Sequence, residues 1–149
     1  MPDTTPTLTG FQTFAQNVAG INTTVMPTND PGWATAFAFA LEWIPPWASN
    51  ASAVLYTAAV YNWGVSELIQ YQQDQSGQVF FQAARKQFGV NNFEAGVVDE
   101  ASDTGTSEHL AVGRGLKNMD LISLQRIKDP FGRQAVAILQ SLGTLWGLT

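Results

Sequence analysis

The sequence predicts an all-α domain of five or six helices, including one long central helix, with a long extended loop or small β-hairpin inserted in its second half. Three observations indicate this fold class. Apolar residues recur at helical spacing along most of the chain, two Asp-Pro pairs stand where helices would begin, and a hydrophilic break interrupts the pattern. Because 149 residues suit one domain with a sizeable core, we expect residues 1–149 to form a single helical domain.

The first two helices are predicted from spacing and capping residues. Apolar residues within Phe11–Val18 share one face of a short helix that ends before Gly20. Asp30-Pro31 combines an N-cap residue with a proline at the first helical position, so a second helix should run to about Ile44 and stop at Pro45-Pro46. Large apolar side chains cover every side of this second helix, and we therefore expect it to be buried all round.

The longest predicted helix follows. Either residue of Ser49-Asn50 can cap it, and its apolar face continues to about Asp74. Gly64 in its middle is either a local weakness or a point of close packing. The next helix should begin at Ser76-Gly77 and close at Gly89.

Residues 89–118 form the hydrophilic break, which we interpret as a long loop or docking arm inserted within the domain. Its apolar patches are Val97-Val98 and Leu110–Val112. The patches either pair as a small hairpin around the turn residues Asp103-Thr104-Gly105, or extend along a neighbouring subunit. Beyond the break, a short helix is predicted between Leu121 and Ile127. The second Asp-Pro pair then begins the last helix, whose apolar stripe contains Phe131, Ala135, Ile138, Leu142 and Leu145.

The charges are ordered along the chain, with acidic residues before basic ones. Residues 1–84 contain no Lys or Arg, and the acids of the break precede most of the cations. This order suits a head-to-tail contact in which the arm of one copy reaches the basic segment of the next, although both segments can also be simply solvated. The arm residues expected at this subunit interface are Val97, Val98, Asp99, Glu100, Asp103, Glu108, Leu110 and Val112. The receiving cations are Arg114, Lys117, Arg126 and Lys128.

Composition excludes several other classes of function. With a net charge of −5 and no cation in the first 84 residues, the chain is not expected to bind DNA sequence-specifically. The absence of cysteine excludes disulfides and thiolate zinc sites. There is no signal-peptide pattern and no apolar run of the roughly 20 residues that a bilayer span needs, so we expect an intracellular chain without a membrane partner.

One string matches a catalytic motif. Asp103-Thr104-Gly105-Thr106-Ser107 has the form of the aspartic-protease signature, in which paired carboxylates share a proton and activate water. That chemistry needs an apolar strand running into the aspartate within an all-β fold. Here Asp99-Glu100-Ala101-Ser102 precedes it in a helical chain. A dimeric aspartic protease using Asp103 is therefore a remote alternative.

The remaining candidate residues are expected to have structural and not catalytic roles. His109 is the single histidine, so a histidine metal site is not expected, and the acids around it could at best hold Ca²⁺ weakly. Glu42 and Glu67 are expected to be rim or inter-helix hydrogen-bonding groups and not general acids. The tryptophans are expected to pack in the core and not to form a ligand-stacking box; they are Trp33, Trp43, Trp47 and Trp63. We predict no catalysis, no cofactor and no metal.

The last part of the chain carries a family resemblance. The strings Leu116-Lys117-Asn118-Met119, Asp129-Pro130-Phe131-Gly132-Arg133 and Gly143-Thr144-Leu145-Trp146-Gly147, with Tyr61-Asn62-Trp63 and Gly77-Gln78-Val79-Phe80-Phe81 before them, resemble the neck adaptors of the tailed-bacteriophage head-to-tail connector. The resemblance implies a structural virion protein without catalysis. Such subunits form a dodecameric ring between the portal protein and a downstream tail or neck protein. DNA would pass through its lumen without specific binding, and the protein would be made in the host cytoplasm before it joins the virion neck.

A different class of protein is the main alternative. A small intracellular binding or inhibitory module of the immunity type would act as a monomer through its acidic loop. The number of copies in the assembled particle separates the two interpretations, because the adaptor forms a ring and the module does not.

Overall fold

The computed structural model describes residues 4–91, 100–103, 106–109 and 125–142. These residues form six α-helices and one pair of short strands, so the expectation of a mostly helical fold is confirmed. Most of the short helix expected between Leu121 and Ile127, and the chain after Leu142, lie outside the described residues.

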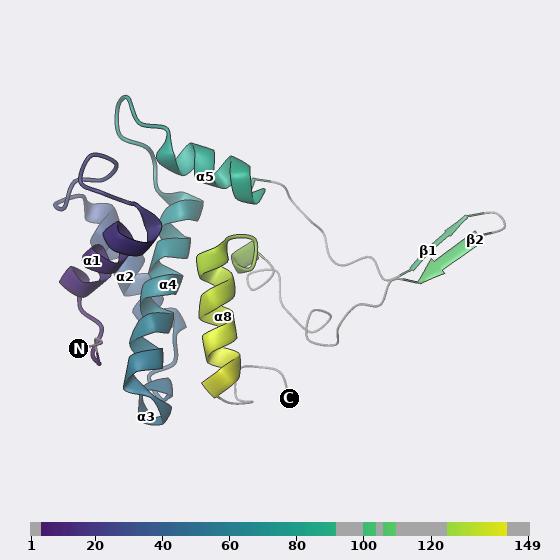
Figure 1. The fold of residues 1–149 in the computed structure, drawn as a ribbon, viewed down its shortest axis with the longest axis horizontal. Coiled ribbons are helices and arrows are strands. Elements are labelled where there is room, and N and C mark those ends of the chain that lie inside the picture. Colours follow the sequence, from purple (N-terminus) through teal and green to yellow (C-terminus); the bar gives the residue numbers. More distant parts are fainter. Residues whose placement is uncertain (1–3, 92–99, 104–105, 110–124, 143–149) are drawn as a thin grey trace.

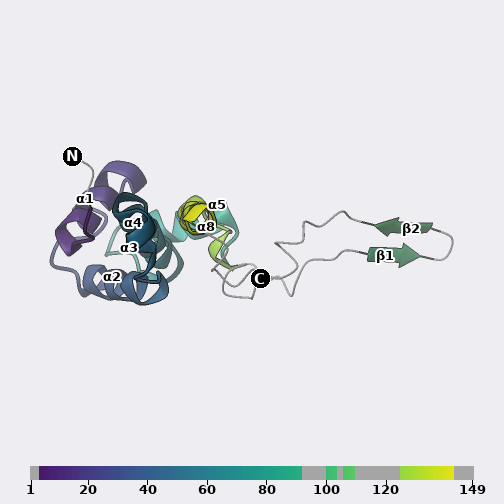
Figure 2. The same ribbon diagram turned by 90° about the horizontal axis from the view of Figure 1, so that it is seen from below.

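Helix α4 (Ala53–Tyr71) lies in the middle of the helical body (Figures 1 and 2). Helices α1 (Leu8–Ala19) and α2 (Pro31–Trp43) pack against one side of it, and α8 (Pro130–Leu142) packs against another. As a result, nearly all of α4 from Tyr56 to Gln70 is buried.

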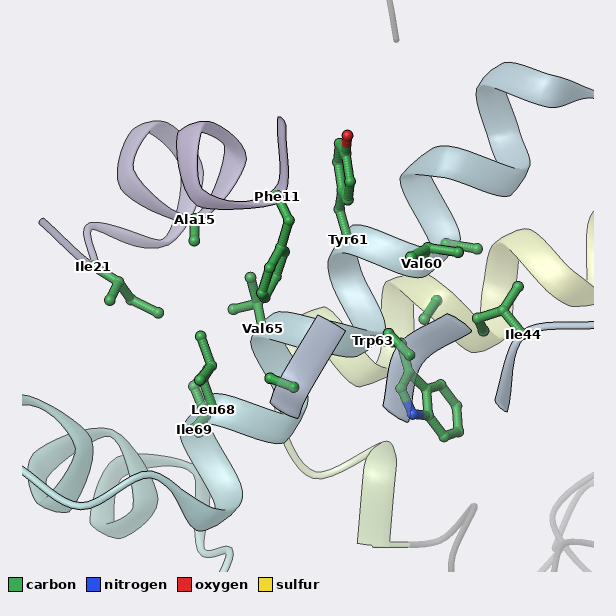
Figure 3. Close-up of a cluster of buried hydrophobic side chains, with 14 of the residues drawn as sticks. Phe11, Ala15, Ile21, Ile44, Val60, Tyr61, Trp63, Val65, Leu68 and Ile69 are labelled. Carbon is green, nitrogen blue, oxygen red and sulfur yellow. The ribbon is translucent and has the colours of Figure 1, made fainter. Parts of the chain in front are cut away.

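Two smaller helices flank the ends of α4. Helix α3 (Ala48–Ala51) precedes it directly, and α5 (Phe80–Phe88) packs near its C-terminal end (Figure 1). The core between these helices is built mainly from aromatic and branched side chains. Figure 3 shows how Phe11 of α1 meets Val65 and the neighbouring residues of α4, whereas Trp63 points toward a different side of the same helix.

Side-chain caps explain where three helices begin. Thr7 Oγ1 accepts a hydrogen bond from the Gly10 amide at 3.0 Å at the start of α1. Asp30 Oδ1 accepts one from the Gly32 amide at 2.8 Å, which confirms the predicted start of α2. The predicted start of the long helix at Ser49 or Asn50 is wrong, because Ser52 takes an extended conformation, separates α3 from α4 and caps α4.

The end of the long helix and the start of α5 also differ from the prediction. α4 ends at Tyr71, before Asp74, and α5 begins at Phe80 instead of near Ser76. The carboxylate of Asp74 is the physical reason. It accepts hydrogen bonds from the amides of Phe81 and Gln82 at 2.8 and 2.9 Å, so it serves the first turn of α5 and lies outside α4.

The prediction that α2 is buried all round is wrong. Trp33 and Ala36 face the core, but Phe39 is 52% exposed and Trp43 is 41% exposed. The helix packs against α1 and α4 with one side only, since the described residues place no further helix over its outer side (Figure 2). An apolar helix therefore leaves a row of aromatic side chains at the surface.

Gly64 is a point of close packing between α4 and α1. A Cβ atom at this position would lie 2.7 Å from Cε2 of Phe11, which is itself fully buried. The ring of Phe11 also lies edge-on to Trp33, with centroids 5.7 Å apart. Because Phe11 is held on several sides, it has little room to move away from an added methyl group.

Strands β1 (Glu100–Asp103) and β2 (Thr106–His109) pair antiparallel (Figure 1). Their register places Glu100 opposite His109 and Asp103 opposite Thr106. The string that matches the protease signature therefore begins at the last residue of β1 and ends within β2. The apolar patches Val97-Val98 and Leu110–Val112, whose pairing was one expectation, lie outside the described residues.

Replacing Gly64 by Ala tests the close packing of α1 on α4. An exposed helical glycine would gain up to about 1 kcal/mol from this change, whereas overpacking a core costs about 1–3 kcal/mol. We expect Gly64→Ala to lower the free energy of unfolding in urea. Adding Phe11→Leu should recover part of the loss by making room. If Gly64→Ala is more stable than the wild type, the packing at Phe11 is looser than the 2.7 Å distance indicates.

Candidate functional site

A group of five buried polar residues joins α4 to the chain that leads into α8. Ser66, Glu67 and Gln70 project from α4, and Arg126 and Asp129 meet them from the other segment. We call this group the polar cluster. Buried polar groups are costly unless they are bonded to one another, so the cluster fixes how the two segments pack.

Asp129 lies at the centre of the polar cluster and is fully buried. Its Oδ1 accepts a hydrogen bond from the Gly132 amide at 2.8 Å, which caps α8. Its Oδ2 accepts from Ser66 Oγ at 2.7 Å and from Gln70 Nε2 at 3.2 Å. One carboxylate thus starts α8 and attaches it to α4.

Arg126 combines an ion pair with stacking on aromatic rings. Its guanidinium is paired with the Glu67 carboxylate and donates to Ser66 Oγ at 3.3 Å. The guanidinium carbon also lies 4.9 Å from the centroid of the Trp63 ring and 5.8 Å from that of Tyr71. These are cation–π distances, so the charge of Arg126 is compensated on several sides within the chain.

Gly132 allows α8 to approach this segment closely. A Cβ atom on Gly132 would lie 1.9 Å from the carbonyl oxygen of Arg126, which no side chain could tolerate. The glycine in the string Asp129–Arg133 therefore has a packing role that follows directly from the position of Arg126.

The two ends of the insertion are held together beside the polar cluster. Gln125 Nε2 donates to the carbonyl oxygen of Val90 at 2.9 Å, and the carbonyl of Gln125 accepts from Gln70 Nε2 at 3.3 Å. Val90 is itself fixed to the end of α5 through its amide, which donates to the carbonyl of Arg85 at 3.0 Å. The described residues on the two sides of the insertion are therefore held together at one point, which we call the insertion root.

A pocket of about 600 Å³ opens between α2 and α4. Arg126 and Glu67 lie at its polar side, and most of its remaining wall is apolar or aromatic. Its lining residues include Ala36, Phe39, Trp43, Leu68 and Tyr71. The size matches pockets that take a bulky side chain or a small ligand, so it is the second candidate site of the body.

Burial raises the pKa of the Glu67 carboxyl above its ordinary value of 4.5, although the charge of Arg126 and its hydrogen bond lower it in part. Desolvation of the carboxylate thus outweighs the attraction of its partner. Glu67 was expected to be a rim or inter-helix hydrogen-bonding group, and it forms an ion pair between α4 and Arg126. Its Oε1 is the oxygen that pairs with Arg126.

The predicted interface cations differ in their surroundings. Arg126 was expected to receive an acidic arm from a neighbour, but it is 4% exposed and its guanidinium is bonded inside the chain. Its proximity to Glu67 depends on the path of the chain and has no signal in the local sequence. Lys128 is partly buried. Arg114 and Lys117 lie outside the described residues.

The predicted arm residues are described in part. Glu100 and Asp103 belong to β1 and Glu108 to β2, where the backbone pairing is known. The others lie outside the described residues; they are Val97, Val98, Asp99, Leu110 and Val112.

The tryptophans divide between core and surface. Trp33 and Trp63 are buried, as expected for core packing, and Trp47 is partly buried against the core. Trp43 instead stacks on Trp63, with ring centroids 5.8 Å apart, and turns its outer face to solvent at the pocket. The sequence indicates these aromatic residues but not the pocket, because the neighbouring helices decide which side of α2 is buried.

Comparisons with protein-family models, with curated proteins and with solved structures find no match to this chain. Within the described ranges, no group of three or more His, Cys, Asp or Glu residues is arranged to hold a metal ion. Among the helices that the structure describes, none is both long and apolar enough to span a bilayer.

Replacing Arg126 by Met tests the polar cluster. The change would leave Glu67 buried without its partner, and breaking a buried ion pair costs about 3–5 kcal/mol. We expect a loss of that order in the free energy of unfolding at neutral pH. Arg133→Met is the matched control, because Arg133 is exposed and donates to the exposed-side carbonyls of Ile127 and Lys128 at 3.2 Å instead of to a buried carboxylate. Adding Glu67→Gln to Arg126→Met should restore part of the loss, and equal stability of Arg126→Met and the wild type would refute the role of the cluster.

The raised pKa of Glu67 predicts a pH dependence of stability. The folded protein holds the Glu67 proton more tightly than the unfolded chain does. The stabilisation from this group is therefore fully present below the unfolded value of 4.5 and is lost as the pH rises through the higher folded-state pKa. Urea unfolding of the wild type and of Glu67→Gln from about pH 4 to about pH 8 measures it. As the pH rises, the free energy of unfolding of the wild type should fall relative to that of Glu67→Gln. A constant difference between the two free energies would show that the pKa of Glu67 is not raised in the folded protein.

Proposed function

We propose that this chain is a non-catalytic structural subunit of a ring-shaped homo-oligomer, the neck adaptor between portal and tail in a tailed bacteriophage. The observation that carries the proposal is the insertion root. A long segment, with an acidic sequence in its first part, is attached at one point to a body of packed helices. An arm with a fixed base can reach a neighbouring copy without disturbing its own core.

We infer that α4 acts as the central helix of each subunit, and that residues 89–118 form the docking arm with the β1–β2 hairpin within it. Glu100, Asp103 and Glu108 would supply negative charge along the hairpin, and Val97, Val98, Leu110 and Val112 would supply apolar anchors. The proposed receiving residues on the next copy are Arg114, Lys117 and Lys128, while Arg126 holds the arm in place at the root.

The distribution of charge in the body supports a lumen wall beside DNA. Residues 1–84 contain no cation, so α1, α2 and α4 present no lysine or arginine to a passing phosphate backbone. The first arginine, Arg85, has its guanidinium bonded to the carbonyls of Ile69 and Gln72 at 3.1 and 2.8 Å. A wall without free cations would let DNA slide, because binding to DNA depends on replacing its counterions.

Particle size tests the proposal against the monomeric immunity-type module. We expect light scattering of the purified protein at about 50 mM salt to give a mass of many copies, and electron micrographs to show rings. Raising the salt to about 1 M should shift the mass downward, since the contact is electrostatic. A single-chain mass at low salt would exclude the ring.

A triple variant identifies the arm as the contact. Glu100→Gln, Asp103→Asn and Glu108→Gln together should reduce the assembled fraction at low salt while leaving the helical circular dichroism unchanged. Glu42→Gln is the matched control, because it neutralises an exposed acid on α2 and should leave assembly unchanged. Rings that form equally well with the triple variant would remove the acidic arm from the contact.

A further inference from the structure

The pocket between α2 and α4 has an aromatic rim that is open to solvent. Phe39 and Trp43 lie on α2, one helical turn apart, and Tyr71 faces them from the end of α4. Their exposed fractions are 52%, 41% and 65%. Three exposed aromatic rings around one opening form an apolar surface typical of protein–protein interfaces.

The polar side of the pocket does not offer a free charge. Arg126 is paired with Glu67 and stacked on Trp63, so the position where a ligand cation could bind among the rings is occupied by the chain itself. An anionic ligand would likewise have to displace the Glu67 carboxylate. The pocket therefore suits an uncharged, bulky apolar group.

One exposed acidic residue, Glu42, lies beside the rim. Glu42 is exposed, and on α2 it lies three residues after Phe39, hence beside it on the helix surface. No lysine or arginine occurs before Arg85, so no cation of α2 or α4 can neutralise Glu42 locally. A partner that approaches the pocket meets an apolar opening with a negative charge at its edge.

We propose that this pocket docks a different protein, one that inserts an aromatic or large aliphatic side chain flanked by lysine or arginine. The negative charge of Glu42 favours lysine or arginine beside the inserted side chain of the partner. Because Arg126 and Glu67 are already paired in the pocket wall, the inserted side chain itself is expected to be uncharged. The inference goes beyond the proposed ring, because it concerns a partner other than the neighbouring copy and uses α2 and α4 instead of the arm.

Two synthetic peptides test this docking surface. Both are fluorescein-labelled helical peptides with equal numbers of lysines, and they differ only in a central Phe or Ala. Burying a phenylalanine ring contributes about 1.5–3 kcal/mol, so fluorescence anisotropy should show the Phe peptide binding the wild type about tenfold or more tightly than the Ala peptide. Glu42→Gln should weaken binding of both peptides and reduce its salt dependence.

Matched variants assign the binding to the pocket. Phe39→Ser and Trp43→Ser should each abolish the preference for the Phe peptide, whereas Val18→Ser, which removes an apolar side chain that is 59% exposed on α1, should preserve it. Circular dichroism confirms that each variant is folded. Equal binding of both peptides to the wild type, or an unchanged preference in folded Phe39→Ser and Trp43→Ser, would overturn the inference.

The same samples separate this inference from the ring proposal. Rings that do not distinguish the peptides would contradict the docking surface alone, and a monomer that does distinguish them would contradict the ring alone. If folded Trp43→Ser no longer forms the oligomeric ring, the pocket binds a second copy of the chain. The inference of a different partner then fails.

Discussion

The buried contact of Asp129 and Arg126 with α4 is the interaction on which the rest of the structure depends. Asp129 is fully buried and bonds at once to the first turn of α8 and to Ser66 and Gln70 of α4. Arg126 pairs with Glu67 close by. Apolar packing alone would allow α8 to slide along α4, since it is not directional. Directed hydrogen bonds between buried groups permit few arrangements, so the cluster determines the register of the two helices.

The same contact shapes both candidate sites. Gln70 reaches from the cluster to the carbonyl of Gln125, and Gln125 reaches Val90, so the insertion begins and ends at a position that α4 decides. On the other side, the Arg126–Glu67 pair closes the pocket and removes its free charge. A change in the cluster should therefore affect the arm and the pocket together, although they lie on different surfaces.

This arrangement gives a physical reason to assign the two surfaces to different partners. The arm has charges that suit an electrostatic contact between copies, which depends on salt and is weak for each pair of residues. The pocket presents apolar rings, and burial of such rings supplies larger and less salt-dependent affinity. A subunit of the proposed ring that also held another protein would benefit from contacts that differ in this way, because each could form without competing for the same residues.

The sequence by itself determined the helical fold class, the starts of α2 and α8 and the ends of α1 and α5, because caps, prolines and glycines act locally. It also pointed to Gly64 as a possible packing contact and to the insertion as the unusual segment. It did not predict that Ser52 divides the long helix, that Asp74 serves α5, or that Phe39 and Trp43 face solvent. Only the tertiary structure decided the roles of Glu67 and Arg126, which are far apart in the sequence. Each has the pattern of an ordinary charged residue, and their pairing, burial and raised carboxyl pKa arise when α4 and the segment before α8 exclude water between them.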